Sequence, residues 1–161
     1  DSRRRCQWSA PIGMSVLGRA YQAAQPVNWT HMADLASSRV GVVNGYVNTD
    51  AFDAAVSAGI LRVDGASSDE SNLRKLLRER IDVAVIDREV MGYLLAEPAL
   101  RNQAGQLAFH PHWLGELPLR VCFRHGARLQ PILAAMQAHR LPAAQLRAGQ
   151  RDYLRQLAEQ R

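Results

Sequence analysis

The sequence predicts an α/β fold in which a parallel or mixed sheet is flanked by helices. Two short segments, residues 39–44 and 81–87, are rich in Val and Ile, and each ends on a polar residue and passes directly into a helical pattern. Short strands that alternate with helical segments are typical of a parallel sheet covered on both faces. With 161 residues, 47% of them hydrophobic and 22% charged, the chain is long and apolar enough for a globular core.

The first half of the chain predicts strands and helices in alternation. Apolar residues predict a strand over 13–21, and residues 31–35 predict a helical turn with Thr30 as its N-cap. Residues 40–43 predict a buried strand. Asn48 or Thr49 then caps a helix over 50–57, whose apolar residues recur at spacings of three and four and which ends at Gly59. A further strand is predicted over 60–63.

The second half begins with another capped helix. Ser67 or Ser68 caps it, and Leu73, Leu76 and Leu77 form its buried face. The remaining predicted elements are a strand over 83–86, a helix over 88–95, a polar loop over 99–105, strands over 106–109 and 119–123, a helix over 129–139, and a last helix or pair of helices over 144–157, interrupted near Gly149.

The positive charge of the chain does not indicate nucleic-acid binding. The formal net charge is +5, but the basic residues are scattered and interleaved with acids, which is typical of a solvated surface. No apolar run reaches the roughly 18–20 residues of a membrane span. The polar N-terminal residues do not resemble a signal peptide. We therefore expect no nucleic-acid partner and no membrane span in this chain.

The chain contains two cysteines, Cys6 and Cys122, which are far apart and in no metal-binding spacing. They can form one disulfide if the protein is exported. Two buried thiols are the alternative.

The predicted sheet places a group of polar residues where a ligand would bind. Open parallel sheets bind ligands just beyond the carboxyl ends of their strands. Asn44, Gly45 and Tyr46 follow one strand, and Asp87 ends another. These residues therefore form the candidate binding edge. Asp87 can also simply cap the helix that follows it, and the two roles can coexist.

A series of segments along nearly the whole chain follows one known pattern. The segments are Trp-Ser-Ala-Pro-Ile at 8–12, the strand at 13–21, Asp-Leu followed by Val-Gly-Val at 34–42, the helix and strand at 69–87, Leu-Pro-Leu-Arg-Val-Cys-Phe-Arg at 117–124, and the C-terminal helices with Gly-Gln-Arg-Asp-Tyr at 149–153. Together they resemble bacterial extracellular solute-binding proteins of the amino-acid-binding kind, the two-lobed type II periplasmic binding proteins.

This resemblance implies a domain organisation. Residues 1–25 correspond to the end of the first lobe and a hinge strand. Residues 26–118 correspond to the second-lobe α/β domain, and residues 119–161 to the return hinge strand and the C-terminal helices. Most of the first lobe is then expected to be absent from this chain.

The resemblance also implies a ligand site. Proteins of this family clamp an amino acid between the lobes, with its ammonium group on an acid at the position of Asp87. The solute carboxylate meets backbone N–H groups of the second lobe and an arginine of the first, for which Arg3 and Arg4 are candidates. The second-lobe turn consists of Asn44, Gly45, Tyr46, Val47 and Asn48. Valine stands at position 47, where amino-acid binders usually have a hydroxyl residue. We therefore expect the solute to be either an amino acid or a related compound.

The function implied by the resemblance is solute capture in the periplasm, as the binding component of an ABC-type importer with a membrane permease as partner. The alternative is a ligand-sensing domain of a receptor or a regulatory domain of a cell-wall enzyme. A dehydratase on the same fold would need a catalytic acid, and Asp87 and Glu89 are the nearby acids. His110 and His112 could share a metal ion but have no evident third ligand. We therefore expect a protein that is not an enzyme and uses no cofactor or metal.

Overall fold

A computed structural model describes residues 6–124 and 129–159 of the protein. The chain divides into two compact units, which are considered separately. Unit 2 is Val16–Glu116, and unit 1 combines Asp1–Ser15 with Leu117–Arg161. Among the described residues, no helix is long and apolar enough to cross a membrane.

Unit 2 is built on a six-stranded mixed sheet with strand order β4-β3-β5-β2-β6, in which β7 also pairs with β2. β3 runs parallel to β4 and β5, whereas β2 runs antiparallel to β5 and β6. The strands are β2 (Gly13–Gln22), β3 (Val40–Val43), β4 (Val63–Ala66), β5 (Val83–Asp87), β6 (Leu107–Phe109) and β7 (Gly115–Leu119). The parallel or mixed sheet expected from the sequence is therefore present.

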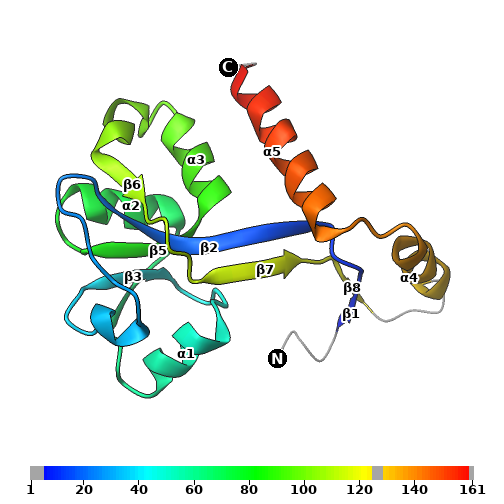
Figure 1. The fold of residues 1–161 in the computed structure, drawn as a ribbon, viewed down its shortest axis with the longest axis horizontal. Helices are drawn as coiled ribbons and strands as arrows, with labels where there is room; N and C mark the ends of the chain where they lie inside the picture. The colour runs from blue at the N-terminus through cyan, green and yellow to red at the C-terminus, as the bar shows by residue number, and fades with distance from the viewer. Residues whose placement is uncertain (1–5, 125–128, 160–161) are drawn as a thin grey trace. The chain divides into compact units, whose positions relative to one another are not determined.

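Helices cover this sheet on both faces, with α2 and α3 on one side and α1 on the other (Figure 1). The core under α2 and α3 includes Leu73, Leu76, Ile86 and Met91, all nearly inaccessible to solvent. Burial of such side chains is the main favourable term in folding. The helices of unit 2 are η2 (Met32–Leu35), α1 (Asp50–Ser57), α2 (Asp69–Leu77), α3 (Arg88–Ala96) and η3 (Arg101–Gln106), where η denotes a 3-10 helix.

Unit 1 contains a short ribbon in which β1 (Cys6–Trp8) pairs antiparallel with β8 (Cys122–Arg124). It also contains the helices α4 (Leu129–Ala138) and α5 (Ala143–Glu159). Cys122 is exposed and disulfide-bonded. The alternative of two buried thiols is therefore wrong.

The strand predicted over 60–63 is wrong, because only its last residue lies in a strand, β4. Gly59 adopts the left-handed conformation, with φ of 73°, and ends α1. The N–H groups of Ile60 and Leu61 then both donate to the carbonyl of Ala55. These residues therefore fold back on the end of the helix, and their apolar character reflects the burial of Leu61 rather than strand pairing.

The single strand predicted over 119–123 is in fact two strands, β7 and β8. Arg120 and Val121 leave the ladder because both bind Ser9: the Arg120 guanidinium donates to the Ser9 carbonyl, and the Val121 N–H donates to Ser9 Oγ at 3.0 Å. Residues 6–8, predicted only as polar, form β1 because β8 supplies a partner strand.

Three local predictions in helical regions also need correction. The polar loop predicted over 99–105 is mostly the 3-10 helix η3. The N-cap of η2 is His31 rather than Thr30. The helix α5 runs through Gly149 without interruption, because one glycine lowers helix propensity by only about 1 kcal/mol.

Candidate ligand-binding site

The carboxyl ends of β3, β4 and β5 lie at one edge of the unit 2 sheet, and a helix begins just after each of them. β3 pairs with β5 in parallel through Val40 with Val83, so the two strands point the same way. Residues 44–48 follow β3, and Asp87 ends β5. The first N–H groups of a helix have no partners within it and favour negative charge. This edge therefore combines a carboxylate with several helix N-termini.

The turn after β3 depends on Gly45. This residue has φ of 79°, a left-handed conformation that residues with side chains rarely adopt. No atom lies within 4 Å of the position that a Cβ would occupy, so the glycine is required by backbone conformation and not by lack of space. Beside it, Asn44 lies against Gly65, where a Cβ would clash with the Asn44 side chain. The turn is thus closely fitted to β4.

Asn48 is held by the helix that follows it. Its backbone N–H and its side-chain Nδ2 both donate to the Asp53 carboxylate, at 3.3 and 3.2 Å. The Thr49 hydroxyl accepts from the Phe52 N–H and caps α1. The predicted cap and bounds of α1 are therefore confirmed. The Asn48 amide is committed to α1, so this residue fixes the shape of the turn.

Tyr46 and Val47 project from the turn into solvent, with exposed fractions of 62% and 54%. Exposed aromatic and aliphatic side chains beside a polar edge can cover the apolar part of a small ligand. Neither side chain contributes to the core of unit 2.

Asp87 lies half-buried at the end of β5, opposite Leu17 of β2. Its Oδ1 atom accepts from the N–H groups of Glu89 and Val90, at 2.7 and 2.9 Å. Asp87 is therefore the N-cap of α3. This is the capping role considered from the sequence, and it holds the carboxylate in a fixed orientation at the sheet edge.

Asp69, at the start of α2, is a second acid of this edge that the sequence reasoning did not select. Burial raises the pKa of its carboxyl group, and the nearby charge of Asp87 raises that pKa further. The edge therefore carries two neighbouring carboxylates, which is favourable for a cationic group. The sequence signal was the Ser68-Asp69 start of a helix directly after a strand.

Glu89, named above as the second nearby acid, forms an ion pair with its neighbour Arg88. The Arg88 Nη2 atom lies 2.9 Å from Glu89 Oε1, and the guanidinium lies 5.4 Å from the centre of the Trp113 ring. The Glu89 carboxylate is therefore engaged by its neighbour at the start of α3.

The structure does not bring the other candidates of the described residues, His110 and His112, to this edge. Arg3 and Arg4 lie outside the described residues. His110 and His112 both contact the Trp29 ring, with centroids 6.2 and 4.8 Å away. Within residues 6–124 and 129–159, no group of three or more His, Cys, Asp or Glu side chains could hold a metal ion.

Comparison with known proteins gives a match in structure only. No family model and no curated protein matches the sequence. An ancestral arginine-binding protein bound to arginine superimposes with a TM-score of 0.64 at 17% identity, over 84% of this chain and 59% of its own length. The GluR0 ligand-binding core with L-glutamate gives a TM-score of 0.64 at 17% identity, over 96% and 62%.

The chain has the fold of a type II periplasmic binding protein. A third structure of this kind is the periplasmic domain of BvgS from B. pertussis, with a TM-score of 0.66 at 15% identity over 91% of this chain and 27% of that one. At these identities the likeness is one of fold. The chain spans 59% and 55% of the length of two arginine-binding proteins that it resembles, one ancestral and one from T. maritima.

Proposed function

We propose that the protein binds a small polar solute that carries an ammonium group, an amino acid or a related compound, at the edge formed by residues 44–48 and Asp87. The observation that supports this most is the position of Asp87, a half-buried carboxylate at the carboxyl end of β5, with the charge of Asp69 nearby. Ammonium groups bind strongly to carboxylates that are partly removed from water and held in place.

The solute carboxylate would meet the N–H groups of Gly45 and Val47 in the turn and those that begin α1, where the helix dipole favours negative charge. Tyr46 and Val47 would cover its side chain. Val47 has no hydroxyl group, so only its backbone N–H can donate. Arg3 and Arg4 stay the two candidates for a single arginine that would meet the same carboxylate.

In the wider protein, residues 1–25 would form the end of the first lobe and a hinge strand, and residues 26–118 the second lobe. Residues 119–161 would form the return hinge strand and the C-terminal helices. Ligand contacts from both lobes would stabilise a closed state over an open one. The role would be the substrate-binding component of an ABC-type importer, in the periplasm and with a membrane permease as partner. The exposed disulfide at Cys122 supports an oxidising compartment.

A second candidate role is ligand sensing in a receptor. Its support is the likeness to the BvgS periplasmic domain, which the chain matches over 91% of its length. The same solute contacts would then control a signalling domain instead of docking on a permease. Neither role needs a catalytic group.

A thermal-shift screen of amino acids and related solutes tests the proposal. A solute that binds only the folded state raises the melting temperature, by an amount that grows with its concentration above Kd. Asp87→Asn is the decisive variant, because asparagine caps helices about as well as aspartate but carries no charge. We expect it to keep the stability of α3 and to lose the shift produced by an ammonium-bearing solute.

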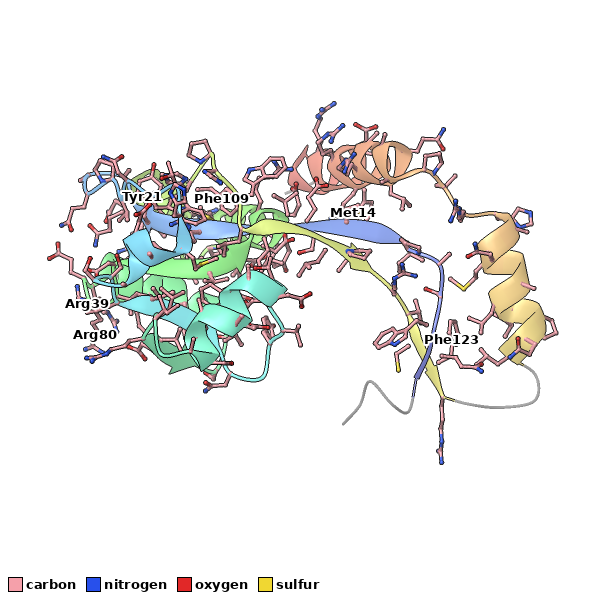
Figure 2. The ribbon with its side chains drawn as sticks, turned by 60° about the horizontal axis from the view of Figure 1, so that its bottom comes forward. Met14, Tyr21, Arg39, Arg80, Phe109 and Phe123 are labelled. Atoms are coloured by element: carbon pink, nitrogen blue, oxygen red, sulfur yellow. The ribbon has the colours of Figure 1, made fainter. Side chains whose placement is uncertain are left out.

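The matched control is Asp82→Asn, at the opposite end of the same strand. Asp82 pairs with Arg39 through Oδ1 and Nη2 at 2.6 Å, and Figure 2 shows Arg39 beside Arg80 at that end of unit 2. This variant should keep the full ligand-induced shift. If the unsubstituted protein and Asp87→Asn showed equal ligand-induced rises in melting temperature, Asp87 would not contact the solute. Its role would then be limited to capping α3.

A further inference from the structure

Arg19, in the middle of β2, is a buried cation whose guanidinium finds no hydrogen-bond acceptor in the part of the chain that the structure describes. Its side chain is 1% exposed, and among the described residues none accepts a hydrogen bond from Nε, Nη1 or Nη2. A guanidinium carries five N–H donors and remains charged in proteins. Leaving such a group unpaired in the interior costs several kcal/mol. An acceptor at this position would remove that cost.

The neighbours of Arg19 cover its faces but do not satisfy its donors. Val85 lies opposite on β5, and on the other side the His110 N–H donates to the Arg19 carbonyl. The Trp29 ring stacks on the guanidinium, with 3.4 Å from its centroid to Arg19 Cζ. A cation–π contact uses the face of the guanidinium and leaves the N–H groups along its edge unpaired.

His110 brings no negative charge to the environment of the Arg19 guanidinium. Its Nδ1 atom accepts from the Trp29 indole N–H at 3.3 Å and from the His112 backbone N–H at 3.1 Å. Burial lowers the pKa of His110, and the charge of Arg19 lowers it further, so the imidazole is neutral at pH 7. Tyr21 packs edge-on against His110, and Figure 2 shows Tyr21 close to Phe109.

The charge at this position is therefore positive and uncompensated. Burial lowers the pKa of Arg19 to about 9, with no opposing effect of a carboxylate, so Arg19 is still protonated at neutral pH. A metal ion held by His110 and His112 is disfavoured, because the guanidinium repels it. The chemistry that fits is an anion.

We propose that Arg19 binds a small carboxylate or similar planar oxyanion beneath residues 23–31, at a site separate from the sheet edge with Asp87. A planar oxyanion matches the fork of N–H donors on the guanidinium edge, while Trp29 continues to cover its face. Trp29 lies over the guanidinium, and in residues 23–31 the side chains other than Val27 and Trp29 are exposed. Because the Arg19 nitrogens are inaccessible, entry of the anion requires the chain to open locally beside Trp29, while the Trp29 ring keeps its contact with the guanidinium.

Formate is the probe, because it is a small carboxylate without a side chain. The protein contains three tryptophans, so Trp8→Phe and Trp113→Phe leave Trp29 as the single emitter. Formate replaces chloride at constant ionic strength. We expect a saturable change in Trp29 emission and a parallel rise in melting temperature. If Trp29 emission stayed constant, or changed without saturating as formate increased, the proposal would be wrong. This outcome can be read in the background protein, in which Arg19 is unchanged.

Arg19 variants in the same background test the assignment. Arg19→Met should abolish the response to formate and should melt at a higher temperature than the background protein in chloride, because it removes a buried unpaired charge. Arg19→Lys keeps the charge but loses the fork, and should weaken formate binding at least about tenfold. Arg39→Met, at an exposed arginine, should respond as the background protein does.

An unchanged formate affinity in Arg19→Met or Arg19→Lys would show that the anion binds elsewhere. A lower melting temperature of Arg19→Met in chloride would show that Arg19 is a structural group with an internal partner. The experiment uses no amino acid and leaves Asp87 intact, so its failure and that of the proposed solute site are distinguishable.

Discussion

The helices of unit 2 and those of unit 1 bury their apolar side chains to very different degrees. In unit 2, Leu73 and Leu76 of α2 are fully buried against the sheet. In unit 1, Leu129 is the one buried residue among the described side chains of α4 and α5, and Ile132 of α4 is 48% exposed. Isolated helices of this length are marginal in water, and tertiary packing supplies most helical stability in proteins. The stability of α2 and α3 therefore comes mainly from packing on the sheet. The stability of α4 and α5 depends more on the helix propensity of their own residues.

The largest expected effect tests this difference in the core. Leu73→Ala removes a fully buried side chain and should lower the free energy of unfolding by about 2–5 kcal/mol. Ile132→Ala, the matched change on α4, should alter it by no more than about 0.5 kcal/mol. Urea denaturation followed by circular dichroism measures both values. A comparable loss at Ile132 would mean that α4 is covered in solution.

The second prediction concerns a polar side chain inside the unit 2 core. Asn72 of α2 is 0% exposed, and among the described residues neither its Nδ2 nor its Oδ1 atom has a hydrogen-bond partner. Asn72→Leu removes two buried polar atoms, so we expect the free energy of unfolding to rise by about 1–3 kcal/mol. Asn102→Leu, at an exposed position, is the control and should change little. A loss of stability in Asn72→Leu would show that the amide has a partner or that the larger side chain does not fit.

The smallest expected effect concerns two glycines at which an added Cβ would meet no steric obstacle. The comparison isolates the cost of an unfavourable backbone conformation. A Cβ at Gly149 of α5 or at Gly59 after α1 would meet no atom within 4 Å, but only Gly59 has a positive φ, of 73°. Gly149→Ala should therefore stabilise the protein by about 0.5–1 kcal/mol. Gly59→Ala should destabilise it, because alanine is strained at positive φ. Thermal melts of the two variants give the comparison, and a gain from both would contradict it.

The elements of unit 2 that the sequence predicts best are those in which local and tertiary signals agree. The bounds of β3 and α1 match the prediction, because the apolar spacing coincides with a capping residue, Thr49, and a terminating glycine. The helix α2 likewise begins after Ser68, whose hydroxyl accepts from the Ser71 N–H. In each case the residues that start and end the element lie directly beside it in the sequence.

β1 and the break between β7 and β8 were not predicted, and both depend on distant partners. β1 exists through its pairing with β8, more than a hundred residues later in the chain, and the binding of Ser9 to Arg120 and Val121 separates β7 from β8. The place of Asp87 and Gly45 at one edge of the sheet follows from the sequence, because Asp87 ends β5 and Gly45 lies just after β3, and both strands can be recognised from the sequence. The proximity of the Asp87 and Asp69 carboxylates was not predicted, because it arises only when the N-termini of α2 and α3 come together in the fold.

The sequence by itself determined most of the succession of strands and helices, a helix cap at 48 or 49, at 67 or 68 and at Asp87, and the edge of the sheet at which polar residues gather. These features follow from hydrogen bonds and apolar spacings within a few residues. Only the tertiary structure decided that Arg19 is buried with no acceptor among the described residues, that Asn72 lies in the core, and that Ile132 of α4 is exposed. Burial depends on which segments cover a residue, and those segments come from distant parts of the chain.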